Sequence, residues 1–246
     1  MKKVKFLNIL IDLISMSDTI NLIEKAIVNN YQIHHTVVNA GKIVKMQSDK
    51  FLKESVNSAD IINVDGQGVV WGMKLLGINI NERVAGIDLM ERLVKKSHEK
   101  GYKCFFLGAK DDVLLKLING YKEKYSDQII GGYRNGYFDD KEELSVVQQI
   151  NNSKSNILFV GITSPKKEVF LNKYKLELSN VNFILGVGGS FDVISGKVKR
   201  APIWMQKNGL EWFFRFIQEP KRMWKRYFFG NIKFIWLVLK EYFTRK

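Results

Sequence analysis

The chain has 246 residues, of which 46% are apolar and 26% charged, a composition typical of a folded protein and not of a disordered one. Its net charge of +14 is uneven, because residues 197–246 hold 13 of the 39 Lys and Arg residues but only 3 of the 25 Asp and Glu residues. A basic surplus in one segment predicts an anionic partner there, such as phosphate groups, nucleic acid or an anionic membrane surface.

The first residues are basic and then apolar, but Asp12 and Asp18 interrupt the apolar stretch and no small-residue cleavage site follows. We therefore interpret residues 4–10 as a first strand and not as a secretion signal. The single cysteine, Cys104, lies in an apolar run and has no second cysteine with which to form an internal disulfide. The sequence thus predicts an inert core thiol and a cytosolic protein.

Short apolar runs alternate with amphipathic segments along the first 185 residues. The predicted strands are residues 4–10, 33–38, 61–64, 103–107, 128–130, 157–160 and 181–185. The predicted helices are residues 17–29, 40–57, 66–76, 88–99, 111–125, 141–151 and a segment from Pro165, while residues 131–140 are expected to form a polar loop. This alternation predicts an α/β fold, a Rossmann-like, mainly parallel sheet with helices on both faces.

Polar or glycine-rich residues follow five of these strands. They are Asn39, Asp65, Gly108, residues 163–165 and residues 186–190. Ligands of parallel sheets bind at the carboxyl ends of the strands. We therefore expect these residues to meet at one edge of the sheet and to form a crevice of nucleotide size.

Residues 186–190 form a glycine loop between the last strand and a helix start. Gly186, Gly188 and Gly189 allow a ligand to approach the backbone amides, and a helix N-terminus attracts phosphate. The loop is not G-x-G-x-x-G, because residue 191 is Phe, and no P-loop lysine follows it. These differences argue against an NAD enzyme and against ATP hydrolysis. Asp192, beside the loop, is either a functional carboxylate or an ordinary helix-start residue.

Asp65 is the first candidate for a catalytic base, because a carboxylate after a strand and before Gly66 projects into the expected crevice. The alternative is a turn or helix-cap aspartate, which the Asp-Gly pair also favours. Arg83 is a candidate for a bidentate phosphate contact, although a surface ion pair is the commoner role of an arginine.

Neither the histidines nor the carboxylates have the spacing of a metal site. His34, His35 and His98 lack ligand spacing with Cys104, and no Asp-x-Asp occurs. We therefore predict no metal and no cofactor. If the substrate is a nucleotide sugar, its diphosphate must be neutralised by backbone amides and by basic residues of the C-terminal segment. These residues are Arg215, Arg222, Lys225 and Arg226.

From Trp204 onward the pattern is helical and holds four of the five tryptophans, with Pro220 expected to start a new helix. Basic side chains flank aromatic ones, which favours a surface at a lipid interface; the alternative is packing on the body or on another subunit. The apolar run at residues 234–239 is far shorter than the roughly 18–20 residues of a membrane-spanning helix. We expect residues 1–196 to form an α/β catalytic domain and residues 197–246 a basic, aromatic, membrane-associating appendage.

Several ordered motifs together resemble the TagA/WecG/CpsF glycosyltransferases of bacterial surface-polymer synthesis, nearly end to end. The matching stretches are residues 65–71, 83–86 with 88–89, 164–168, 186–196, 200–202, 209–212, and 219–222 with 226–227. The resemblance implies a metal-independent, inverting transferase at the inner face of the cytoplasmic membrane. It would move a sugar from a UDP-sugar to a polyprenyl-diphosphate-linked sugar, as in the transfer of ManNAc or its uronic acid to lipid-linked GlcNAc.

The resemblance also implies roles for residues. Asp65 matches the proposed base, Asn39 and Arg83 match donor-pocket positions, and Arg215 and Arg222 match arginines of an appendage that closes over the diphosphate. An oligomer that becomes active at the membrane is a further implication, and the sequence leaves the oligomeric state open.

Three positions depart from the family pattern. Val37 stands where a threonine is usual, Lys167 where a glutamine is usual, and Lys225 where an arginine is common. A lysine near the sugar would favour another hexose or an acidic sugar, so the donor remains open.

Two other functions compete with glycosyl transfer. A non-catalytic membrane- or nucleic-acid-binding module would use the basic, aromatic tail, since aromatic side chains stack on bases. It would leave the crevice without a task, so we expect no nucleic-acid partner. A methyltransferase built on the glycine loop would not explain the tail.

Overall fold

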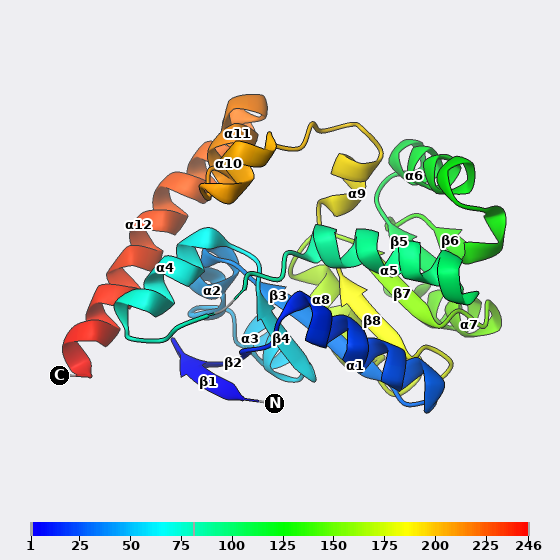
Figure 1. Ribbon diagram of the computed structural model, residues 1–246, viewed down its shortest axis with the longest axis horizontal. Coiled ribbons are helices and arrows are strands. Elements are labelled where there is room, and N and C mark those ends of the chain that lie inside the picture. The colour runs from blue at the N-terminus through cyan, green and yellow to red at the C-terminus, as the bar shows by residue number, and fades with distance from the viewer. Residues whose placement is uncertain (1, 81, 246) are drawn as a thin grey trace.

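The computed structural model describes residues 2–80 and 82–245, except for the side chains of Arg222, Lys225 and Arg226. Strands and helices alternate over most of the chain and helices end it (Figure 1). The strands are β1 (Lys3–Phe6), β2 (Ile9–Asp12), β3 (Ile33–Val38), β4 (Ile61–Val64), β5 (Cys104–Gly108), β6 (Ile130–Arg134), β7 (Ile157–Gly161) and β8 (Phe183–Gly186). The helices are α1 (Met16–Val28), α2 (Ala40–Met46), α3 (Lys50–Asn57), α4 (Gln67–Leu75), α5 (Gly86–Lys100), α6 (Asp111–Lys124), α7 (Glu143–Asn152), α8 (Lys166–Lys173), α9 (Ser190–Ile194), α10 (Ile203–Lys207), α11 (Glu211–Gln218) and α12 (Pro220–Thr244), with a 3₁₀ turn at Asp127–Ile129.

Strands β3 to β8 form one sheet in the order β4-β3-β8-β7-β5-β6, and every neighbouring pair is parallel. Side chains alternate between its two faces. In β5, Cys104 and Phe106 pack with helices α1, α5 and α6, whereas Phe105 and Leu107 pack with α7 and α8. Helices thus cover both faces, as the near-continuous apolar strand runs predict. The predicted α/β fold is confirmed.

The predicted first strand at residues 4–10 is wrong. Strands β1 and β2 pair antiparallel and form a hairpin outside the main sheet. Leu7 and Asn8 make its turn with φ of 48° and 62°, the left-handed conformation that two-residue hairpin turns require. A leucine rarely adopts positive φ, so the sequence carried no clear turn signal.

The single helix predicted at residues 40–57 is two helices, α2 and α3. Asp49 begins the second, because its side chain accepts a hydrogen bond from the Leu52 amide at 2.9 Å. The polar loop predicted from residue 131 is also wrong at its start, because β6 extends to Arg134 and pairs with β5. Gly132 allows this pairing, since a Cβ atom there would lie 2.7 Å from the Phe105 ring.

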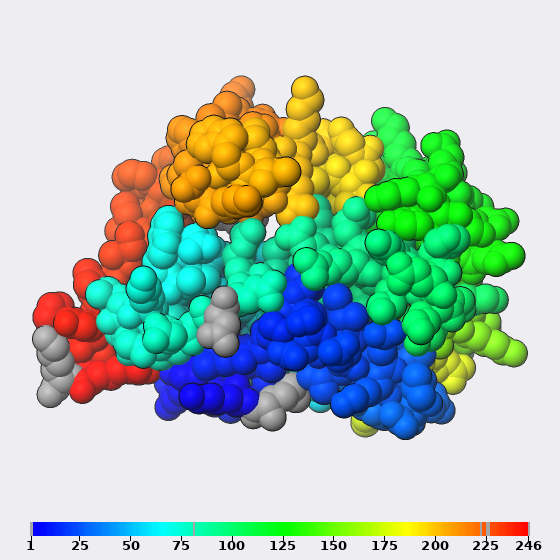
Figure 2. Space-filling model, viewed as in Figure 1, coloured from blue at the N-terminus to red at the C-terminus, as the bar shows by residue number. Residues whose placement is uncertain are grey.

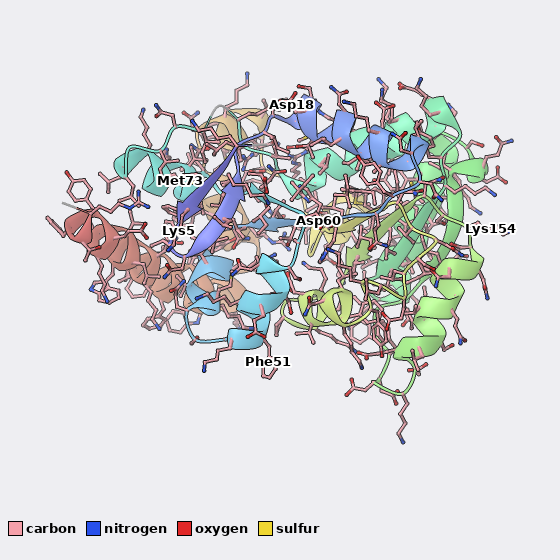
Figure 3. All side chains as sticks on the ribbon, turned by 90° about the horizontal axis from the view of Figure 1, so that it is seen from below. Lys5, Asp18, Phe51, Asp60, Met73 and Lys154 are labelled. Carbon is pink, nitrogen blue, oxygen red and sulfur yellow. The ribbon has the colours of Figure 1, made fainter. Side chains whose placement is uncertain are left out.

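Pro220 begins α12, as predicted, and this helix packs along α2 and α4 at one end of the body (Figure 1). Phe234 and Val238 are buried in a core cluster that also contains Phe6 of the hairpin. The Glu241 carboxylate accepts a hydrogen bond from the Leu7 amide at 3.0 Å. Figure 3, seen from below, shows the C-terminal helix beside the hairpin strand labelled at Lys5. Among the described residues, no helix is long and apolar enough to cross a bilayer.

Candidate active site

A cavity of about 1340 Å³ lies where the carboxyl ends of the strands meet the C-terminal helices. Figure 2 shows an opening here between the gold and orange segment and the cyan and teal helices. Its wall contains Asn39 after β3, Asp65 after β4, Thr163 after β7 and the glycine loop after β8. At the end of β5 the lining residues are Ala109 and Lys110, because Gly108 lies against the Gly161 backbone. The expected crevice is therefore present.

The structure brings most of the predicted site residues into this one cavity. Its lining includes Asn39, Asp65, Arg83, Lys167, Gly186, Gly188, Gly189, Asp192 and Arg215. The side chains of Arg222, Lys225 and Arg226 lie outside the described residues, so their predicted diphosphate contacts stay predictions.

Asp65 is held by its backbone, not by its carboxylate. Its amide donates to the Val38 carbonyl at 3.0 Å, and its own carbonyl accepts from Arg83 Nη1 at 3.1 Å. Within the described part of the chain, no hydrogen bond or ion pair joins the carboxylate. Burial raises its pKa above the ordinary value, and the nearby Arg83 charge opposes that rise only in part. A free carboxylate with a raised pKa suits proton abstraction near neutral pH.

Asn39 has a structural task in addition to its place in the cavity wall. Its Oδ1 accepts from the Lys42 amide at 3.0 Å and caps α2. A Cβ atom at Gly66 would lie 3.1 Å from the Asn39 Cβ, so this glycine lets the turn after Asp65 approach the cap closely. The Asn39 amide nitrogen has no hydrogen-bond partner among the described residues and remains able to donate to a ligand.

Three charged side chains are buried together beside the glycine loop. Glu168 Oε1 lies 2.8 Å from Lys42 Nζ and 3.2 Å from Lys167 Nζ. The two ammonium groups hold the pKa of Glu168 at about 2, and burial together with Lys42 lowers the pKa of Lys167 to about 8. At neutral pH this cluster carries one excess positive charge against the loop.

Lys167 approaches the loop because the loop has no side chains there. A Cβ atom at Gly186 would lie 3.4 Å from Lys167 Nζ, and one at Gly188 would lie 3.9 Å away. Gly188 also has φ of 53°, a conformation that glycine adopts at little cost. The ammonium group therefore lies close to the backbone of the loop.

Arg83 forms an ion pair, but its partner is partly buried and lies 128 residues away in the sequence. Its Nη1 lies 2.6 Å from Glu211 Oε2 at the start of α11. Arg200 Nε lies 3.8 Å from the other Glu211 oxygen, and Arg200 Nη2 lies 2.6 Å from Asp88 Oδ1. These contacts join the C-terminal segment to the body around Asp65.

Arg215 reaches the opposite side of the glycine loop. Both of its terminal nitrogens would lie 3.2 Å from a Cβ atom at Gly189, and its Nε lies 3.4 Å from Glu219. Asp192, one turn further, lies 3.9 Å from Lys197, and among the described residues it forms no hydrogen bond or ion pair with Asp65. The loop thus lies between Lys167 and Arg215.

Sequence reasoning missed Lys42 and Glu168. Lys42 lies one turn after the Asn39 cap, which places it at the same end of the sheet and was an available signal. Glu168 lies in a charged stretch that resembles an exposed helix start.

No metal cluster is found among the described residues: no three His, Cys, Asp or Glu side chains are grouped suitably. Burial lowers the pKa of His34 and of His35 to about 4, and burial raises that of Cys104 to about 12, so these groups are neutral at pH 7. The metal-free reaction stays a prediction.

A family model described as the WecG/TagA/CpsF family of glycosyl transferases matches residues 4–246. The chain belongs to this family. It is also similar to two proteins named N-acetylglucosaminyldiphosphoundecaprenol N-acetyl-beta-D-mannosaminyltransferase. The one from Bacillus subtilis (strain 168) is 36% identical over 198 residues, which cover 80% of this chain and 75% of that protein. The one from Bacillus spizizenii is 37% identical over 196 residues, with coverage of 80% and 74%.

Membership of the WecG/TagA/CpsF family confirms the resemblance and makes the chain a glycosyltransferase. The binding-module and methyltransferase interpretations are therefore not favoured.

Proposed function

We propose that this glycosyltransferase moves a sugar from a UDP-sugar to a sugar carried on polyprenyl diphosphate, without a metal and with inversion at the anomeric carbon. N-acetylmannosamine is the first candidate for the transferred sugar and lipid-linked N-acetylglucosamine for the acceptor. Both sugars are those in the names of the two Bacillus relatives.

One observation carries the proposal. A carboxylate with a raised pKa and no protein partner within the described residues shares a cavity with a glycine loop flanked by Lys167 and Arg215. A base on one wall and an anion site on another are what sugar transfer from a nucleotide diphosphate requires.

The reaction follows from this arrangement. Asp65 takes the proton of the acceptor hydroxyl while that oxygen attacks the anomeric carbon of the donor. The bond from this carbon to the diphosphate oxygen breaks, and the electron pair leaves with UDP. Lys167, Arg215 and the loop amides stabilise the charge that develops on the departing diphosphate. One displacement from the face opposite the leaving group inverts the configuration.

Lys167 bears on the choice of donor. The excess positive charge of its cluster lies beside the loop, where it can meet either the diphosphate or an acidic group on the sugar. Donors with a neutral N-acetylhexosamine and with the corresponding uronic acid are therefore the two classes to compare.

We place the enzyme at the inner face of the cell membrane as a peripheral protein. More than half of the side-chain surface is exposed in Trp204, Phe228 and Trp236, and basic residues lie between them in the sequence. This combination favours an anionic lipid interface, where the acceptor is held. Residues 197–246 are the proposed membrane-associating part, although Phe234 and Val238 fasten α12 to the body. A homo-oligomer stays an alternative to a monomer.

The test is a UDP-release assay in the presence of a metal chelator, with a panel of UDP-sugars and a short lipid-diphosphate-N-acetylglucosamine acceptor. Release from UDP-N-acetylmannosamine supports the first candidate. Release only from the uronic acid or from another UDP-hexose keeps the reaction and changes the donor. No release from any donor, or release that requires added metal, contradicts the proposal.

A further inference from the structure

Ion pairs cross from the C-terminal segment to the body next to Asp65. Glu211 at the start of α11 uses one carboxylate oxygen for Arg83 and the other for Arg200. Arg83 in turn binds the Asp65 carbonyl, and Arg200 binds Asp88 in the first turn of α5. All five residues except Asp88 line the cavity.

The hydrogen bonds of Arg83 occupy only one edge of its guanidinium group. Nη1 donates both to Glu211 Oε2 at 2.6 Å and to the Asp65 carbonyl at 3.1 Å. Within residues 2–80 and 82–245, no partner is found for Nη2 or Nε. An arginine has five N–H donors in a fixed plane, so fixing one nitrogen sets the direction of the others. Two adjacent N–H groups match a phosphate.

We propose that Glu211 is a positioning residue of the transfer reaction, which holds Arg83 against the Asp65 backbone so that the free edge of the guanidinium group faces the donor diphosphate. This inference rests on the proposed function, since it assumes a nucleoside-diphosphate donor in the cavity.

Two other roles for Glu211 make different predictions. As an ordinary acidic residue in the first turn of α11, it would stabilise that helix through the helix dipole and would not affect ligand binding. As a blocking group, it would occupy Arg83 until phosphate displaced it, and its removal would strengthen UDP binding. The two hydrogen bonds that fix Nη1 while the other edge stays open favour positioning.

The first experiment measures UDP binding by calorimetry, with no acceptor present, to the full chain and to Glu211→Ala and Glu211→Gln. Glu211→Ala is expected to weaken UDP binding by about 10- to 100-fold, the scale expected when hydrogen bonds to a charged phosphate are lost. Glu211→Gln keeps an oxygen that accepts from Arg83, so its loss is expected to be smaller. Unchanged UDP affinity would leave only the helix-end role, and stronger binding would support the blocking role; either outcome overturns the proposal.

Glu241→Gln is the matched control. Glu241 is also a C-terminal carboxylate that binds the body, but its partners, the Leu7 amide at 3.0 Å and Arg245, are not part of the cavity lining. This variant is expected to bind UDP as the unaltered protein does. An equal loss in Glu241→Gln and Glu211→Ala would mean that docking of the C-terminal helices, and not Arg83, is the cause.

A pH profile supplies a second readout. The charged groups that act on Asp65 include Arg83, Glu211, Lys42, Asp88 and Lys167, and the negative charge of Glu211 raises the pKa of Asp65. Glu211→Gln should therefore move the acid limb of the kcat profile to lower pH. An unmoved limb contradicts the proposal. If UDP binding depends on Glu211 but the unaltered protein transfers no sugar, the proposed function fails and this inference stands. If it binds no UDP, both fail.

Discussion

A Cβ atom added at Gly72 of α4 would lie 3.2 Å from Cζ of Phe234 of α12 and 3.0 Å from Val238 Cγ2. The two helices therefore meet through a residue without a side chain. Because α12 also contributes to the cavity wall, this contact links the packing of the C-terminal helix to the shape of the site.

Gly72→Ala is expected to lower the free energy of unfolding by about 1–3 kcal/mol, because the added methyl group overpacks the contact with α12. Gly68→Ala is the control in the same helix, since an added Cβ there meets no atom within 4 Å. That variant should be neutral or should stabilise by up to about 1 kcal/mol, from the higher helix propensity of alanine. Urea unfolding measures both. Equal changes in the free energy of unfolding of the two variants would contradict the close contact between Gly72 and α12.

Glu168→Gln is expected to cost about 3–5 kcal/mol of stability, since it leaves two buried ammonium groups without their carboxylate. Lys167→Gln keeps the Lys42–Glu168 pair at 2.8 Å and removes the excess charge, so it should cost much less or stabilise. Chemical denaturation at pH 7 compares the two variants. A larger loss of stability in Lys167→Gln than in Glu168→Gln would contradict the assignment of Glu168 as the group that stabilises the two buried lysines.

UDP binding should weaken as the pH rises through about 8. Burial and Lys42 lower the pKa of Lys167 to about 8, so the ammonium group beside the glycine loop loses its charge in that range. Lys167→Gln should bind UDP less tightly at pH 7 and should lack this alkaline fall. Titration calorimetry between pH 6.5 and 9.5 provides the measurement. A fall that persists in the variant assigns the titration to another group.

Asp65→Asn is expected to abolish transfer and to leave UDP binding largely intact. The amide has the same size as the carboxylate and leaves the backbone contacts with Val38 and Arg83 in place. It cannot, however, take the proton from the hydroxyl group of the acceptor sugar. Steady-state UDP release and UDP calorimetry are the two readouts. Unchanged turnover would remove Asp65 from the mechanism.

Replacing exposed aromatic residues of α12 should reduce binding to vesicles that contain anionic lipid. Phe228→Ser and Trp236→Ser remove exposed apolar surface that we assign to the interface. Phe51→Ser on α3 is the control, because Phe51 is 76% exposed but lies on the body (Figure 3). Vesicle sedimentation measures binding. Equal losses in the three variants would contradict a membrane role specific to the C-terminal helices.

Point substitutions test the membrane role better than deletion of residues 197–246 does, because the deletion would also remove Phe234 and Val238 from the core.

The parallel sheet and its ligand edge could be predicted from the sequence because buried parallel strands are continuous apolar runs that end in polar or glycine residues. The hairpin could not, since Leu7 in a left-handed conformation looks like the middle of a strand. Local pattern also misled at α8. Lys167 and Glu168 resemble an exposed helix start, yet both are buried, because a lysine from another helix supplies the compensating charge.

The pairing of Arg83 with Glu211 spans 128 residues and has no local signal. Each residue alone has the sequence context of a surface charge. Only the packing of α11 against the body brings them together, and packing between distant elements is what a single sequence reveals least.

The core cluster shared by Phe6, Phe234 and Val238 has a consequence for biosynthesis. The hairpin and helices α2 to α4 leave the ribosome long before α12 does. Until α12 arrives, Val69 and Met73 have no cover from that helix, and the cavity lacks one wall. The cavity therefore has its complete shape only after α12 has packed against α2 and α4, and the apolar residues that α12 covers stay exposed until then.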